Sequence, residues 1–247
     1  MAYLVALDYG HGGSDSGASA NGLVEKVINR KIGYQVKDLL IYNGIQVIEL
    51  AGNENTYVSL QARTNKENRS GANIIVSIHN NAGGGEGTEI IYSRVGGKGK
   101  ELAEKLQAEI SKHHVFRKIY TRIGQNGRDY YHMIRETKAP AIITEYGFVD
   151  NINDAQRLKN STFLEQMAKD TVRGISNFFG VAYKEPQPAQ QDLNNHSKEN
   201  DAIDGVVHRV IVDGAQVGAF DNAESIGDLV TKYVIQGKKN IVIQRVK

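Results

Sequence analysis

The chain has 247 residues, of which 40% are hydrophobic and 23% are charged, proportions typical of a soluble globular protein. The formal net charge of +2 is too small to favour nucleic acid as a partner by bulk attraction. Because no cysteine is present, disulfides and thiolate metal sites are excluded. Any metal ion must therefore be held by histidine and carboxylate side chains.

The sequence has no sign of a membrane or export segment. No stretch approaches eighteen apolar residues, so we expect no membrane insertion. Met1 leads directly into the apolar segment YLVALD, without the basic region, long apolar region and cleavage site of a secretory signal. We therefore expect the protein to be made and folded in the cytoplasm, and to need a separate route of release if it acts elsewhere.

Short apolar runs alternate with amphipathic stretches over the first 180 residues. In Glu25–Tyr42 the apolar residues recur every three or four positions, which predicts a helix. The same reasoning predicts strands over residues 3–7, 45–50, 73–79, 88–93 and 141–149, and further helices over residues 58–72, 98–114 and 162–179. Residues 115–137 have a weaker pattern, which indicates polar loop and one short helix near residues 128–135.

This order of elements predicts an α/β fold. Strands alternate with helices, and runs such as residues 3–7 are apolar on both faces, as in a sheet that is covered on both sides. We therefore expect a mostly parallel twisted sheet flanked by helices, and we assign this domain to residues 1–182.

The composition changes after Gly180. Residues 183–203 hold two of the three prolines among mainly polar residues, which is typical of a linker. In residues 204–247, apolar and polar residues alternate on both sides of Asp213-Gly214, which predicts a hairpin. A helical stretch with Asn222 as its N-cap and a last apolar strand complete a small α+β domain of order β-β-α-β.

Four side chains with metal or proton chemistry fall at one edge of the predicted sheet. Ligands of a parallel α/β sheet bind outside the carboxyl ends of its strands, and His11, His79 and Glu145 lie at or near such ends, while Glu25 starts the first helix. Two imidazoles and one carboxylate, with a position left open for water, form a catalytic zinc site. A further carboxylate can move the proton of that water to a leaving amine, and Glu145 is available for this role.

At these residues the chain resembles the zinc-dependent N-acetylmuramoyl-L-alanine amidases of the amidase-3 family, found in phage endolysins, autolysins and spore-wall enzymes. The matching segments, in order, are LDYGHGGSDSGA, NGLVEKVINRKI, SLQARTNKEN, ANIIVSIHNNA, GTEIIYS and APAIITEYGFVDNINDAQRL. The resemblance implies that His11, Glu25 and His79 bind Zn2+ and that Glu145 is the catalytic glutamate. It also implies cleavage of the amide between N-acetylmuramic acid and the L-alanine of the stem peptide of peptidoglycan.

The leading hypothesis is a phage endolysin that acts on bacterial peptidoglycan after holin-dependent release from the host cytoplasm. A host autolysin of this family would usually carry an export signal. The alternatives are a zinc carboxypeptidase or other peptidase acting on wall peptides, a host autolysin or spore-wall amidase, and a wall-binding protein with a degenerate site. The presence of all four site residues argues against the last of these.

Other parts of the sequence carry less specific predictions. We expect Asn81 and His132 to contact substrate, whereas Arg63 and Arg69 either hold their helix in place or line the cleft. The C-terminal domain resembles the small wall-binding units of endolysins from phages of Bacillus, which implies that it binds peptidoglycan or another wall polymer.

Overall fold

The computed structural model describes residues 3–186 and, nearer the C-terminus, residues 208–213, 215–220, 226, 229–230, 233 and 241–245. The chain forms two compact units, Met1–Pro186 and Gln187–Lys247. Within the described ranges, no helix is both long and apolar enough to cross a bilayer.

A six-stranded sheet with the order β4-β1-β5-β8-β6-β7 forms the centre of the first unit. The strands are β1 (Leu4–Tyr9), β4 (Gln46–Glu49), β5 (Ile74–Asn81), β6 (Thr88–Tyr92), β7 (Phe116–Tyr120) and β8 (Ala141–Phe148). β4, β1, β5 and β8 are parallel to one another, whereas β6 is antiparallel to β8 and parallel to β7. The prediction of a mostly parallel sheet is thus confirmed, and one edge of it runs in the opposite direction.

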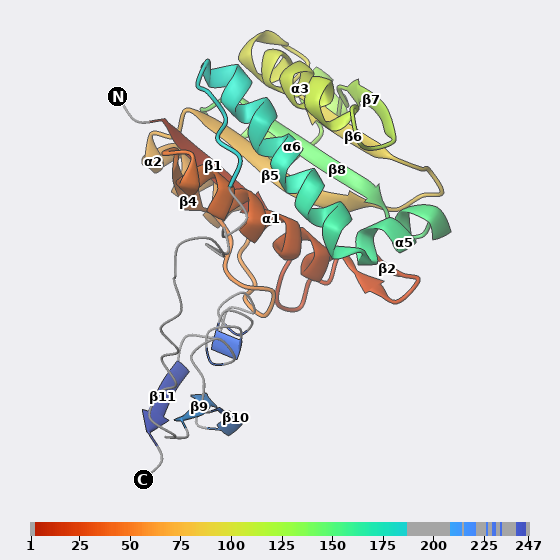
Figure 1. The fold of residues 1–247 in the computed structure, drawn as a ribbon. Coiled ribbons are helices and arrows are strands. Elements are labelled where there is room, and N and C mark those ends of the chain that lie inside the picture. The colour runs from red at the N-terminus through yellow and green to blue at the C-terminus, as the bar shows by residue number, and fades with distance from the viewer. Residues whose placement is uncertain are drawn as a thin grey trace. The chain divides into compact units, whose positions relative to one another are not determined.

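The two faces of this sheet are covered unequally. Helices α1 (Glu25–Tyr42), α6 (Ser161–Phe179) and α3 (Gly97–Ile110) lie side by side over one face (Figure 1). The shorter helices α2 (Leu60–Ser70) and α4 (His132–Arg135) belong to the other face. The remaining elements are β2 (Ser19–Ala20), β3 (Leu23–Val24), the 3-10 turn Gln125–Gly127 and α5 (Ile152–Lys159). The second face is therefore left partly open, beside the short helix α4.

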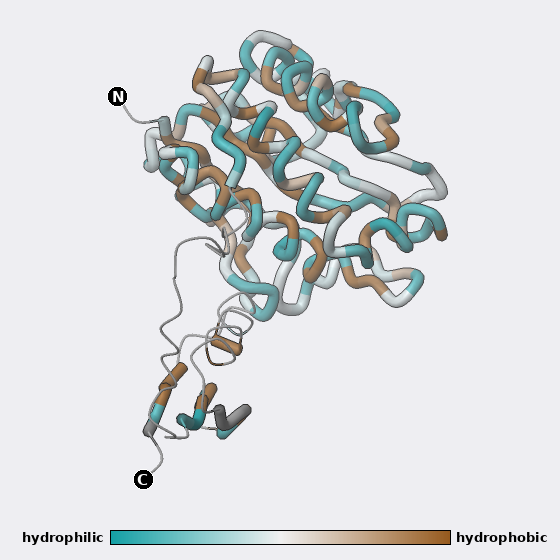
Figure 2. The backbone as a smooth tube through the Cα atoms, viewed as in Figure 1, coloured by the Kyte–Doolittle hydropathy of each residue, from teal (hydrophilic) through white to brown (hydrophobic). Residues whose placement is uncertain are grey.

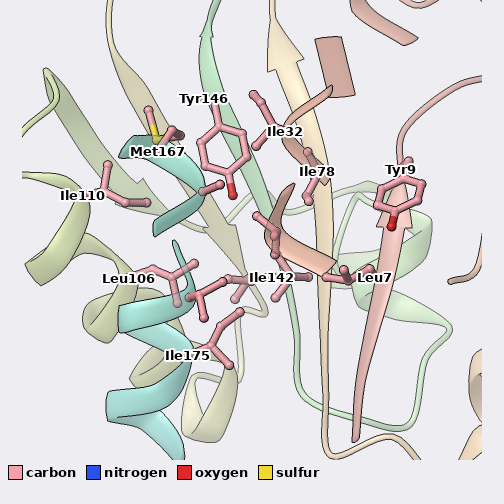
Figure 3. Packing of buried hydrophobic residues seen from close by; sticks show 14 of the residues in the cluster. Leu7, Tyr9, Ile32, Ile78, Leu106, Ile110, Ile142, Tyr146, Met167 and Ile175 are labelled. Atoms are coloured by element: carbon pink, nitrogen blue, oxygen red, sulfur yellow. The ribbon is translucent and has the colours of Figure 1, made fainter. Parts of the chain in front are cut away.

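The larger core lies between the sheet and the three long helices. Leu7, Ile78 and Ile142 from the strands meet Leu106 of α3 and Ile175 of α6, and all of these side chains are fully buried (Figure 3). Figure 2 shows a corresponding pattern, in which hydrophobic and hydrophilic residues alternate within the turns of the helices and some of the strands include long hydrophobic stretches. Burying such side chains contributes about 1.5–3 kcal/mol each to the stability of the fold. This layer therefore holds the sheet in place.

The structure departs from the sequence-based expectation in three places. Residues 115–137 contain the strand β7 in addition to the predicted short helix, which is α4. Asn151 caps an additional helix, α5, by accepting hydrogen bonds from the backbone N–H groups of Asn153 and Asp154. The helix predicted to reach His114 ends at Ile110, and a turn follows it.

The described part of the second unit is a three-stranded antiparallel sheet of order β10-β9-β11. Its strands are β9 (His208–Val212), β10 (Ala215–Phe220) and β11 (Ile241–Arg245). Val210, Val212 and Ile226 are buried together, and the described residues near position 226 are helical. Asn222 and residues 187–203 of the expected linker lie outside the described residues. The described start of that expected linker, residues 183–186, belongs to the first unit, where Glu185 pairs with Lys169 over 2.9 Å.

Candidate functional site

Two neighbouring strands bring the predicted site residues to the open part of the sheet. β5 and β8 are buried along almost their whole length, and only His79, Asn81 and Glu145 among their residues are partly exposed. His79 and Glu145 are partners in the ladder between these strands, so their side chains point to the same face. His11 follows the end of β1, the other neighbour of β5, and Glu25 begins α1.

The donor atoms of three predicted ligands converge. His11, Glu25 and His79 each offer one nitrogen or oxygen, and these atoms all lie within 4.8 Å of one another. Glu25 Oε1 lies between the two imidazoles, 3.2 Å from His11 Nε2 and 2.9 Å from His79 Nδ1. Glu145 Oε2 is buried and has no hydrogen-bond partner. Two imidazoles, a shared carboxylate and a second, unpaired carboxylate form a donor set that fits a zinc ion with a base beside it.

The ring of His11 is oriented by a neighbouring carboxylate. His11 Nδ1 lies 2.9 Å from Asp15 Oδ1, which leaves Nε2 facing Glu25. Asp15 Oδ1 also accepts a hydrogen bond from the backbone N–H of Gly17, so the carboxylate is itself held in place. A carboxylate on the far nitrogen fixes the orientation of a metal-binding histidine and raises its basicity. Asp15 was not among the residues predicted from the sequence, although its position four residues after His11 in the same loop was a signal for it.

Two buried arginines hold the backbone of His11. This residue has a φ of 64°, in the left-handed region that side chains other than glycine rarely adopt. Its carbonyl oxygen accepts hydrogen bonds from Arg30 Nη2 and from Arg63 Nη2, both at 2.9 Å. Arg63 also pairs with the buried Asp8 over 2.8 Å. The hydrogen bonds from the two arginines thus maintain the strained conformation that points His11 toward Glu25. Sequence patterns do not identify these contacts.

Two glycines leave room for this arrangement. A Cβ atom at Gly10 would overlap the ring of His79. A Cβ atom at Gly17 would lie 2.5 Å from Glu25 Oε2 and 2.6 Å from His11 Cδ2. Both positions therefore require glycine because ligand side chains occupy the space, and Gly17 also has a φ of 64°.

Burial and mutual contact shift the protonation of these groups. Burial by itself lowers the pKa of His11, but its hydrogen bonds to Glu25 and Asp15 outweigh this effect and raise the pKa to about 9. Burial acts upward on the pKa of Glu25, yet the two histidines hold that pKa well below its ordinary value. Burial raises the pKa of Glu145 to about 7, against an opposing effect of His79. Glu145 can thus exchange a proton near neutral pH, as a general base must.

A cavity of about 310 Å³ adjoins His11 and His79 on the open face. Its walls include Tyr57 and Leu60 before and at the start of α2, and Tyr131 and His132 at α4. His132 thus lies in the wall of this cavity, with its Nε2 atom 3.3 Å from Thr64 Oγ1.

Asn81 is also exposed on this face, but its side chain is engaged by protein groups. Its Nδ2 atom donates to Glu89 Oε2 over 3.3 Å, and its Oδ1 accepts from the backbone N–H of Ala82. Contact of Asn81 and His132 with substrate stays a prediction.

Glu89 is a second buried carboxylate that the sequence analysis did not select. It is the ladder partner of Glu145 on β6 and is 3% exposed. Glu89 Oε1 lies 3.1 Å from Arg117 Nη1 and 3.5 Å from Lys118 Nζ, both on β7. Because its charge is paired in this way, Glu89 differs from the unpaired Glu145 beside it.

Comparison with known proteins adds to this geometry. Residues 5–177 match the family described as N-acetylmuramoyl-L-alanine amidase. The chain is 39% identical over 181 residues to the N-acetylmuramoyl-L-alanine amidase CwlM of Bacillus licheniformis, which covers 72% of this chain and 69% of that protein. It is 35% identical over 180 residues to the sporulation-specific N-acetylmuramoyl-L-alanine amidase of Bacillus subtilis, and the match covers 72% of this chain and 68% of that protein. It is 33% identical over 208 residues to an endolysin of Bacillus phage SPP1, and the match covers 80% of this chain and 74% of that endolysin.

Solved structures are similar over the same part of the chain. The N-acetylmuramoyl-L-alanine amidase of Clostridium difficile 630 superposes with a TM-score of 0.66 at 30% identity, over 72% of this chain and 97% of that one. The catalytic domain of the amidase CwlV from Bacillus (Paenibacillus) polymyxa gives a TM-score of 0.65 at 28% identity, over 73% and 99%. The similarity thus covers the first unit, which carries the four site residues.

Proposed function

The chain belongs to the N-acetylmuramoyl-L-alanine amidases, which are hydrolases of peptidoglycan, and on that premise we propose that it acts through zinc held by His11, Glu25 and His79. The observation that supports this assignment is the convergence of three donor atoms within 4.8 Å beside the unpaired oxygen of Glu145. Zn2+ bound at these residues would polarise the substrate carbonyl and lower the pKa of a water molecule toward about 7.

The protein side chains have separate roles in this proposal. Glu145 takes a proton from the attacking water and passes it to the nitrogen of L-alanine as the amide bond breaks. Its raised pKa suits both steps, because the group must accept and release a proton near neutral pH. Asp15, Arg30 and Arg63 keep His11 in its orientation.

The test is hydrolysis of purified Gram-positive cell walls with and without a chelator. We expect new L-alanine amino termini, loss of activity with chelator, and recovery when Zn2+ is restored. New reducing sugars without new amino termini would refute the amidase assignment. Glu145→Gln should lower hydrolysis at least about a hundredfold while zinc content is kept, whereas Glu165→Gln, at an exposed position of α6, should change neither.

We also propose that the protein is an endolysin released through a holin pore. The support is the match to the endolysin of phage SPP1, which extends over 208 residues, compared with 180 for the sporulation-specific amidase. Expression in the cytoplasm of a Gram-positive host should lyse cells only when a holin is expressed with it. Equal lysis without the holin would contradict this role and favour an exported autolysin or a spore-wall amidase.

The second unit is proposed to bind the cell wall. It has a β-sheet and a small buried cluster of its own, and the first unit holds the complete candidate site. A chain that ends after Pro186 should therefore keep its zinc and some hydrolysis but lose affinity for walls in a sedimentation assay. Equal wall binding by the truncated and full-length proteins would exclude a targeting role for the second unit.

A further inference from the structure

We propose that strand β7 and the residues after it form a subsite for the carboxylates of the stem peptide. This inference rests on the proposed amidase function and concerns where the peptide half of the substrate lies. The cations that form the subsite are Arg117, Lys118 and Arg122, called here the β7 cations.

The register of the sheet connects this edge with the candidate site. His79 is paired with Glu145, Glu145 with Glu89, and Glu89 with Lys118, so one row of side chains crosses β5, β8, β6 and β7. Residues paired in this way point to the same face of a sheet. Lys118 thus lies on the open face that carries His79 and Glu145, at the far end of the same row.

The β7 cations exceed the carboxylates that could neutralise them. Arg117 and Lys118 share the single carboxylate of Glu89, and about half of each side chain is exposed. Arg122 is exposed and, among the described residues, forms no ion pair with a carboxylate. Farther along, Arg128 and Arg135 share the carboxylate of Glu136 in the same two-to-one way. The edge therefore presents net positive charge to solvent.

Aromatic rings lie against all three of these cations, and Arg117 is 5.6 Å from the centre of the Phe148 ring. Lys118 Nζ lies 4.4 Å from the centre of the Tyr120 ring, and the guanidinium of Arg122 lies 3.9 Å from that of Tyr130. Arg122 Nη1 also donates to the hydroxyl of Tyr131, which lines the cavity beside His11 and His79. A stacked guanidinium keeps its outer N–H groups free for a carboxylate, so it binds at a smaller entropy cost than a mobile side chain.

The distances suit a short peptide. Adjacent strands are about 4.8 Å apart, so the Lys118 backbone is about 10 Å from that of Glu145. An extended peptide spans about 3.5 Å per residue, so carboxylates two or three residues beyond the scissile amide reach the β7 cations. The cavity beside His11 and His79, with Tyr57 and Leu60 in its wall, is then available for the muramic acid.

The experiment uses the full chain loaded with zinc and two sets of N-acetylmuramoyl tripeptides, one with free carboxylates and one with the same carboxylates converted to amides. The double variant Lys118→Gln/Arg122→Gln should lower kcat/KM for the free-carboxylate substrate about tenfold, and for the amidated substrate less than twofold. Lys100→Gln, which removes an exposed charge from α3 on the covered face, should change neither.

Binding of the released peptide provides a second readout that needs no hydrolysis. In calorimetry the free tripeptide should bind the wild-type chain more tightly than the double variant, and added salt should reduce the difference. Equal effects of the double variant on both substrates, together with unchanged peptide binding, would overturn the subsite. An effect seen only on walls that carry teichoic acid, and not on the tripeptides, would overturn it in favour of polymer phosphates. Failure to cleave either substrate would refute the amidase function, while peptide binding would still decide the subsite.

Discussion

Arg63→Met is expected to destabilise the first unit by about 3–5 kcal/mol, because it leaves the charge of Asp8 buried without its partner. The side chains of Arg63 and Asp8 are only 4% and 1% exposed, and they lie 2.8 Å apart. Arg63 also donates to the carbonyl oxygens of Tyr9, His11 and Val58 over 2.7–2.9 Å. Methionine fills a similar volume but replaces none of these hydrogen bonds. Loss of the contact to His11 should also weaken zinc binding.

Urea unfolding measures the first effect and competition with a fluorescent chelator measures the second. Arg69→Met is the matched control, because Arg69 is exposed near the end of the same helix and should change stability by less than about 0.5 kcal/mol. Adding Asp8→Asn to Arg63→Met should restore at least about 1 kcal/mol, since the uncompensated charge is removed while Ser77 still contacts the side chain. A loss below about 1 kcal/mol in Arg63→Met, or no recovery in the double variant, would refute this reasoning.

Three further variants test other parts of the structure. Asp15→Ala should lower zinc affinity about 10- to 100-fold in the same chelator competition, and unchanged affinity would remove Asp15 from the site. Gly17→Ala should abolish wall hydrolysis, because its Cβ would lie 2.5 Å from Glu25 Oε2. Gly44→Ala is the control, because Gly44 has a similar positive φ but no atom within 4 Å of a Cβ placed there. This control variant should lose only about 1 kcal/mol of stability. Burial acts upward on the pKa of Asp170, but hydrogen bonds from two neighbouring histidines lower this pKa overall. The wild-type protein should therefore be more stable than Asp170→Asn. This difference in the free energy of unfolding should be full near pH 6 and should shrink as the pH falls below about 4. If urea unfolding gives a stability difference between the two proteins that does not change with pH, the lowered pKa of Asp170 would be contradicted.

The sequence sufficed to predict the sheet and the residues at its open edge. Strands buried on both faces have continuous apolar runs, and the ends of parallel strands meet at one edge whatever the details of packing. His11, His79 and Glu145 could therefore be placed together from strand ends alone. Glu25 could be added because the first turn of a helix that follows a strand starts at the same edge.

The residues that support the site could not be found in this way. Arg63 and Arg69 are six residues apart on one helix, and the sequence analysis treated them alike, yet only Arg63 is buried and contacts His11. Strand β7 was missed because it lies at the edge of the sheet and carries two consecutive charged residues at a bulge, which breaks the alternation of a typical strand. Local patterns record neither burial nor pairing across the sheet.

The reversed direction of β6 places the candidate catalytic residue Glu145 and the positive charges of β7 on the same open face. Because β6 is antiparallel to β8, residues at the start of β6 lie beside residues at the end of β8, and Glu89 becomes the neighbour of Glu145. Both oxygens of Glu89 face protein partners, since Oε1 faces the cations of β7 and Oε2 accepts from Asn81, whereas Glu145 Oε2 has no hydrogen-bond partner. Of these two carboxylates in one row, Glu145 is the one whose pKa is raised by burial, which suits it to proton transfer. The other keeps positive charge at the edge of the same face.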